Sequence, residues 1–131
     1  MEGGCHCGKV RFEMHGDTAH AALYHCSDCR RASSAPMVGW VAIKSDGLKV
    51  EGSPKIYRSS EGVERHFCGD CGTGLFYYSE AVLPGLVDVQ MATLDDADVV
   101  PPVAHIQYAE RLEWTESMFD LPAFERYPET A

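Results

Sequence analysis

The chain has 131 residues, of which 45% are hydrophobic, and these values predict one domain spanning residues 1–131 with an apolar core. Its formal net charge of −9 argues against a nucleic-acid-binding protein, which needs a basic face to meet phosphates. No apolar run approaches the roughly 18 residues that span a bilayer, and no signal peptide precedes the first motif. We therefore expect a cytoplasmic protein that works away from membranes.

Short segments with strand-like patterns recur along the chain, separated by turn signals rich in glycine, proline, serine and aspartate. Several of them alternate polar and apolar residues, which is the pattern of a half-buried strand. The predicted strands are 9–14, 21–24, 37–43, 48–51, 55–59, 63–67, 74–78 and 86–91. Helix is predicted only as single turns at 93–97 and 116–119, so the fold class is mostly β.

Two pairs of cysteines that lie far apart in the chain are each flanked by glycine. Cys5 and Cys7 occur in a Gly-Cys-His-Cys-Gly segment, and Cys68 and Cys71 in Cys-Gly-Asp-Cys-Gly. Such spacing aims two sulfur atoms at one point, and tetrahedral zinc requires four such ligands at about 2.3 Å. The sequence predicts one structural zinc that joins these two distant segments.

Two other interpretations of the cysteines are weaker. A disulfide framework would need an oxidising compartment, to which the sequence shows no route. A thioredoxin-like redox pair would lie where a strand leads into a helix, and neither Cys26-x-x-Cys29 nor Cys68-x-x-Cys71 leads into an amphipathic pattern.

The order of these motifs resembles one known family. The motifs are Gly4-x-Cys5-x-Cys7-Gly8-x-Val10, His25-Cys26-x-x-Cys29-Arg30, Phe67-Cys68-x-x-Cys71-Gly72, Leu94-Asp95, His105 and Trp114. They are similar to those of the glutathione-dependent formaldehyde-activating enzymes, also called the centromere-protein-V-like family, and the similarity extends from Gly4 to about Pro128. The resemblance implies a β-tent fold of the Mss4-like kind, closed by a structural zinc on four cysteines. It also implies a carbon–sulfur lyase that joins glutathione and formaldehyde into S-hydroxymethylglutathione.

Members that resemble the type enzyme hold a second zinc on a Cys-x-Cys-x-x-Cys motif, and this sequence departs from that motif. Tyr24 stands at the first position, which leaves Cys26 and Cys29. A phenol with a pKa near 10 is a poor zinc ligand, and two cysteines alone do not make a stable site. A second zinc would need a further ligand such as His25, His66, Asp28, water or a substrate thiol.

We predict that Cys26, Cys29 and Arg30 are the catalytic residues, acting on glutathione or a related thiol and a small aldehyde such as formaldehyde. Arg30 and Arg31 would lower the pKa of the thiols and bind substrate carboxylates. The alternative is a non-catalytic Mss4-like binding module with one zinc, in which this loop is a relic. We expect His20 to be exposed in a loop, and Trp114 to lie in the core or a cleft wall.

Overall fold

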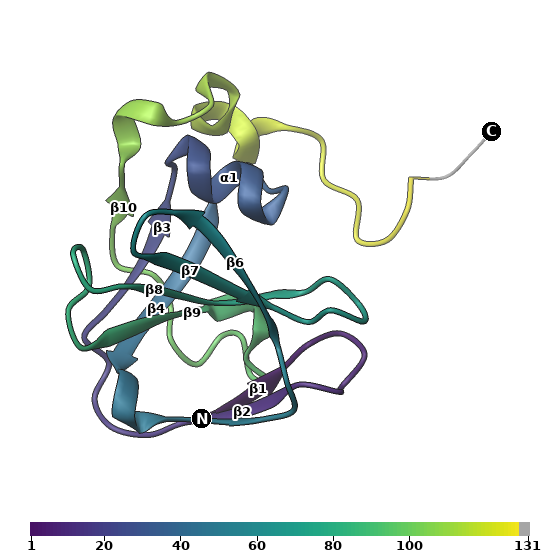
Figure 1. The fold of residues 1–131 in the computed structure, drawn as a ribbon. Helices are drawn as coiled ribbons and strands as arrows, with labels where there is room; N and C mark the ends of the chain where they lie inside the picture. The colour runs from purple at the N-terminus through teal and green to yellow at the C-terminus, as the bar shows by residue number, and fades with distance from the viewer. Residues whose placement is uncertain (129–131) are drawn as a thin grey trace.

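The computed structural model describes residues 1–128 and shows a mostly-β fold, as the sequence predicts (Figure 1). A three-stranded sheet has the order β1 (Glu2–Gly4), β2 (Arg11–Met14), β5 (Leu48–Glu51). A seven-stranded sheet has the order β10 (His105–Ile106), β3 (His20–Tyr24), β4 (Val38–Lys44), β9 (Leu86–Gln90), β8 (Gly74–Ser79), β7 (Val63–Phe67), β6 (Lys55–Ser60). Neighbouring strands are antiparallel, except that β10 pairs with β3 in parallel.

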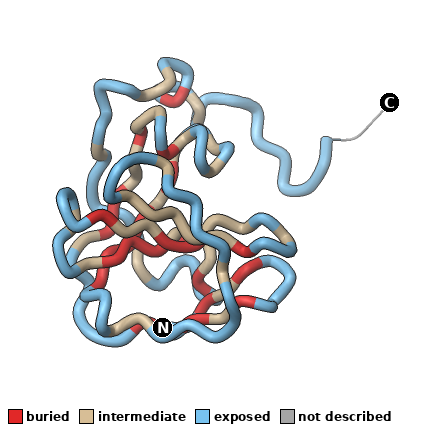
Figure 2. Tube along the Cα trace, viewed as in Figure 1, coloured by how far each residue is buried: buried red, intermediate tan, exposed pale blue. Residues whose placement is uncertain are grey.

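The main core is made of buried residues from both sheets, and Figure 2 colours the buried residues red. Side chains from β4, β8 and β9 are fully buried there: Val41, Ile43, Leu75, Val87 and Val89 are all 0% exposed. Phe12 of the small sheet packs edge-on against Phe76 of the large sheet, with ring centroids 5.3 Å apart. This aromatic pair fixes one sheet against the other.

The strand predictions are confirmed to within about two residues at each end, but three short elements were missed. They are β1, β10 and the helix α1 (Ser27–Ser33), which follows Cys26 directly. The expectation that Cys26-x-x-Cys29 leads into no amphipathic helix is consistent with this short helix, which begins within the motif at Ser27. Only Cys29 of the helix is buried, so α1 has no amphipathic stripe that a sequence pattern would reveal.

Contacts from elsewhere in the fold explain why α1 forms. Glu110 accepts hydrogen bonds from the backbone N–H and the hydroxyl of Ser27, both at 3.1 Å, across 83 residues of sequence. These bonds supply the N-terminal cap that Cys26 itself does not provide. Ser34 ends the helix in the left-handed region, with φ at 51°.

The remaining helical elements are 3₁₀ turns: η1 (Ser45–Gly47), η2 (Met91–Thr93), η3 (Tyr108–Glu110) and η4 (Glu113–Asp120). The predicted turn at 116–119 is confirmed within η4. The predicted turn at 93–97 is wrong, because the turn ends at Thr93 and Leu94 then forms a bridge with Gly3. Burial of Leu94 to 4% exposure favours this extended backbone.

Residues 121–128, after η4, extend away from the two sheets (Figure 1) and are exposed (Figure 2). Trp114 is 54% exposed and borders an open depression instead of lying in the core. Phe119 is 89% exposed. No helix in residues 1–128 combines the length and the apolar character needed to cross a membrane.

Candidate metal centre and thiol cavity

The four cysteines of the predicted metal site meet in the fold. Cys5 and Cys7 lie in the loop that follows β1, and Cys68 and Cys71 lie in the loop between β7 and β8; the two loops run side by side (Figure 1). Their sulfur atoms all lie within 4.8 Å of one another. The Sγ–Sγ distances are 3.6 Å from Cys5 to Cys7 and 3.8 Å from Cys7 to Cys68. A tetrahedron with metal–sulfur bonds of about 2.3 Å has sulfur–sulfur edges of about 3.8 Å, so the residues fit such an ion.

The surroundings favour the thiolate form at Cys5 and Cys71. At Cys7 the backbone N–H of Lys9 lowers the pKa, but burial and the neighbouring thiols outweigh it and raise the pKa to about 11. The Val10 backbone N–H donates to Cys5 Sγ at 3.3 Å, and the Thr73 hydroxyl lies 3.3 Å from Cys71 Sγ. The hydrogen bond from Thr73 lowers the pKa of Cys71 to about 5. All six cysteines of the chain are free, so the disulfide interpretation is wrong. A converging set of thiolates is suited to a soft or borderline metal ion.

The other two cysteines lie together at a second position. Cys26 is the N-cap residue of α1, and Cys29 lies in the first turn with 7% of its surface exposed. Cys29 packs in a small cluster with Val38 and Trp40, and Cys26 borders this cluster. Both cysteines line a cavity of about 270 Å³, which we call the thiol cavity. Its other lining residues are Tyr24, Asp28, Trp40, Arg65, Tyr77, Val82, Leu83, Asp88, Gln107 and Glu110.

The thiol of Cys29 is neutral at physiological pH. Burial raises its pKa to about 11, the Cys26 thiol adds to this effect, and Arg65 opposes it. Nη2 of Arg65 lies 4.0 Å from Cys29 Sγ, so the cation beside this thiol comes from β7. The sequence had placed Arg30 and Arg31 in that position. Desolvation outweighs the nearby charge, and the thiolate is not the resting form.

Arg30 lies in the fold differently from what the sequence predicts. Its Nε donates to the carbonyl oxygen of His25 at 3.3 Å, and its Nη2 donates to the carbonyl oxygen of Glu110 at 3.4 Å. With Arg31 and Trp114 it borders the open depression described above and does not line the thiol cavity. These bonds attach α1 to its flanking segments. A catalytic role for Arg30 stays a prediction.

A second cavity adjoins the thiol cavity. It has a volume of about 340 Å³ and is lined by residues of α1, β6, β7 and β8. Trp40 and Arg65 line both cavities, so the two share a wall. Arg65 lies over the ring of Tyr77, 4.9 Å from its centroid, and its Nε donates to the Ser59 hydroxyl at 3.2 Å. These contacts hold the guanidinium at the boundary between the cavities.

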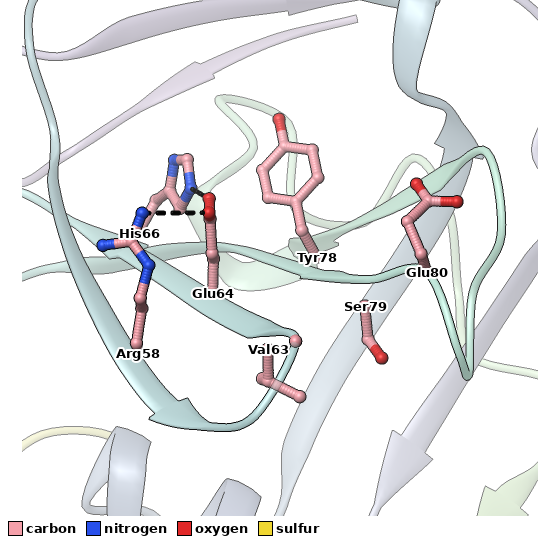
Figure 3. Close-up of a pocket in the computed structure, with 8 residues that line it drawn as sticks. Arg58, Val63, Glu64, His66, Tyr78, Ser79 and Glu80 are labelled. Carbon is pink, nitrogen blue, oxygen red and sulfur yellow. Dashed lines mark hydrogen bonds and ion pairs between the residues drawn. The ribbon is translucent and has the colours of Figure 1, made fainter.

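A third cavity, of about 300 Å³, lies on β6–β8 (Figure 3). Glu64 pairs there with His66 at 3.0 Å and with Arg58 at 3.4 Å, and the ring of Tyr78 stacks near His66. No cysteine lines it. Of these three cavities, the thiol cavity alone is lined by cysteines.

A second metal at Cys26 and Cys29 stays a prediction. Within residues 1–128, the four-cysteine site is the single group in which three or more histidine, cysteine or acidic ligand atoms converge. Two thiols alone do not complete a tetrahedral site, so another ligand would have to come from outside this set.

Three residues of the thiol cavity region escaped the sequence analysis: Arg65, His20 and Asp88. His20 was expected to be exposed in a loop, but it lies in β3 with 27% of its side chain exposed, and its Nε2 is 2.9 Å from Oδ1 of Asp88. The available signal was Asp88 itself, an acid between two apolar residues of a predicted strand. Arg65 gave no signal, because a charged residue in an alternating strand is ordinarily solvent-exposed.

Comparisons with known proteins identify related sequences and a related fold. The sequence model of the glutathione-dependent formaldehyde-activating enzyme family matches residues 1–110. A Halomonas elongata protein that carries the same family designation is 30% identical over an alignment of 131 positions, covering 88% of this chain and 80% of that protein. An uncharacterised lyase of Schizosaccharomyces pombe is 28% identical over 76 positions, covering 58% of this chain and 56% of that protein.

A crystal structure of a Rhodobacter sphaeroides protein is similar in fold, with a TM-score of 0.63 and 26% identity, over 80% of this chain and 99% of that protein. The family match covers the four-cysteine site and the loop that carries Cys26 and Cys29. The chain belongs to the glutathione-dependent formaldehyde-activating enzyme family.

Proposed function

We propose that this protein is a carbon–sulfur lyase that interconverts glutathione plus formaldehyde, or another small aldehyde, with the S-hydroxymethyl adduct. One observation carries the proposal: two thiols and a fixed guanidinium line a cavity that adjoins a second, larger one. Each cavity is close to the lower end of the range of ligand sites, roughly 300–1,000 Å³. Together they offer room for a tripeptide thiol beside a small carbonyl compound.

The chemistry of the lining residues suits these reactants. Cys26 and Cys29 would contact the reacting sulfur and carbonyl groups, and Arg65 would bind a carboxylate of the tripeptide through paired N–H donors. Glu110 and Asp28 give the same cavity an acidic side, which suits the α-amino group of glutathione. A ligand that occupies both cavities would pass beside Trp40 and Arg65, which line both.

The ion we propose for the four-cysteine site is zinc. Four thiolates with tetrahedral spacing are a donor set typical of closed structural zinc sites. There the ion would join the loop after β1 to the loop between β7 and β8, and its contribution would be to the fold. The described residues contain no disulfide, which suits a reducing compartment, and we propose a cytoplasmic location.

The test is binding followed by turnover, on zinc-loaded protein kept reduced. Titration calorimetry should detect glutathione binding, and exchange NMR should show faster interconversion of formaldehyde and its glutathione adduct than in buffer. Arg65→Gln should weaken binding. Arg58→Gln, which removes a 70% exposed side chain from the neighbouring strand, should leave it unchanged. A folded, one-zinc protein with no binding at millimolar glutathione would favour the non-catalytic binding module instead.

A further inference from the structure

A buried acid, Asp88, lines the thiol cavity. Asp88, in the middle of β9, is 3% exposed and lines the cavity together with Tyr24 of β3. A carboxylate at such a position loses the hydration that it has in water, which makes its retention costly unless a partner compensates. Nothing in the thiol chemistry described above uses this group.

The partner of Asp88 is His20 of β3, two strands away across β4. Nε2 of His20 lies 2.9 Å from Oδ1 of Asp88 and 3.2 Å from the hydroxyl oxygen of Tyr24. Burial raises the pKa of Asp88 to about 6, with His20 opposing the shift, so the carboxyl is mostly ionised at pH 7 and above. An ionised carboxylate can only accept hydrogen bonds, so the nitrogen that faces it must carry a proton.

This requirement determines the direction of the Tyr24 hydroxyl proton. The contact between His20 and Asp88 has the distance of an ion pair but is not an aligned hydrogen bond, because Oδ1 has no hydrogen-bond partner in residues 1–128. The N–H of His20 is therefore aligned with the Tyr24 oxygen, which acts as the acceptor. Its own O–H is left free to donate to a third group.

That third group must lie on the cavity side. Tyr24 packs against the cluster of Cys29, Val38 and Trp40, as Cys26 does, and it lines the thiol cavity. Burial raises the pKa of Tyr24 to about 12, so its hydroxyl keeps its proton throughout the physiological range. A fixed, neutral O–H donor in a partly desolvated cavity suits an oxygen on which negative charge develops.

We propose that Tyr24 is a catalytic residue that donates a hydrogen bond to the aldehyde oxygen, and that His20 and Asp88 are positioning residues for its hydroxyl. This inference rests on the proposed function. As the glutathione sulfur forms its bond with the carbonyl carbon, the π electron pair moves to the oxygen, which Tyr24 stabilises. The thiol gives up one proton and the new hydroxyl gains one, through solvent, so no group leaves and nothing is oxidised or reduced.

The experiment compares turnover in wild type, Tyr24→Phe and Asp88→Asn, with Tyr78→Phe as the matched control. Tyr78 lines the separate cavity shown in Figure 3, where the same loss of a hydroxyl should have no effect on turnover. Tyr24→Phe should lower kcat by about 10²-fold, as expected for one oxyanion donor, with KM for glutathione unchanged. Asp88→Asn should lower kcat by less, also without changing KM, since the donor remains but is misdirected.

The possible outcomes separate the two proposals. Turnover by wild type with equal kcat in Tyr24→Phe and Tyr78→Phe would overturn the role of Tyr24 and leave the proposed function intact. A rise in KM with kcat unchanged would also overturn it, since that pattern indicates ground-state binding. A wild-type protein that binds zinc and folds but gives no turnover would overturn both. Thermal melting of each variant identifies any loss of activity that comes from unfolding.

Discussion

Nη2 of Arg65 lies 4.0 Å from the sulfur of Cys29, although 36 residues separate them in the chain. The arginine comes from β7 and the cysteine from α1, and the contact lies at the boundary between two cavities. This pair identifies the cation that shares a site with the thiols. The arginine next to Cys29 in the sequence binds backbone carbonyl groups instead.

The first prediction concerns which arginine binds the substrate. Arg65→Gln should weaken glutathione binding by roughly tenfold or more, since a hydrogen bond to a charged group contributes about 1.5–3 kcal/mol. Arg30→Gln should keep the affinity and lower the melting temperature, because it removes bonds that attach α1. Titration calorimetry and thermal melting check both variants. Weaker glutathione binding in Arg30→Gln, with unchanged binding in Arg65→Gln, would assign carboxylate binding to Arg30 instead.

The second prediction concerns the metal. Cys68→Ser should lose the bound ion and unfold, because structural zinc sites contribute about 10–16 kcal/mol, comparable to the whole stability of a domain. Cys68 is 1% exposed, so no substitute ligand can approach from solvent. Metal analysis and circular dichroism check this variant. Cys26→Ser is the matched control and should keep one equivalent of metal and its fold; a folded Cys68→Ser protein with metal bound would contradict the assignment.

The third prediction is a pH dependence of stability. The pKa of Asp88 rises from 3.8 in the unfolded chain to about 6 in the fold, where it faces His20, Tyr24 and Tyr77. Between these values the unfolded chain releases its proton first, so this group lowers the free energy of unfolding as pH rises and changes nothing above about 6. The free energy of unfolding of Asp88→Asn, taken relative to that of wild type, should therefore increase by up to about 3 kcal/mol from pH 4 to pH 7. Urea unfolding at both pH values measures the difference.

A second carboxyl offers a control of opposite sign. The Arg11 guanidinium holds the pKa of Asp95 below its usual value, so ionised Asp95 stabilises the fold above that value. Asp95→Asn should lose stability relative to wild type as pH rises. If the difference in free energy of unfolding between Asp88→Asn and wild type stays constant with pH, Asp88 does not titrate as described.

The fourth prediction concerns the contact between the two sheets. Phe76→Ala should reduce the free energy of unfolding by about 3–5 kcal/mol, because it leaves a cavity beside Phe12 in a fully buried position. Phe119→Ala, at a side chain that is 89% exposed, should have little effect. Chemical denaturation of both variants gives the comparison. Equal stabilities would mean that the aromatic pair does not hold the sheets together.

The sequence by itself determined the strand pattern and the metal-site cysteines. Period-two alternation is a local consequence of the pleat, so it survives in the sequence wherever one face of a strand is buried. The pairs Cys5 with Cys7 and Cys68 with Cys71 are recognisable because each is made by neighbours in the chain with glycine beside them. Both signals are short-range, and the family resemblance depends on them.

Only the tertiary structure decided the helix and the contents of the thiol cavity. Helix α1 is capped by Glu110, 83 residues away from Ser27, so no local pattern reports it. Arg65 reaches Cys29, and Asp88 reaches His20, through the pairing of strands that are distant in sequence. Long-range contacts of this kind depend on strand order and register, and the chemistry of the cavity follows from them.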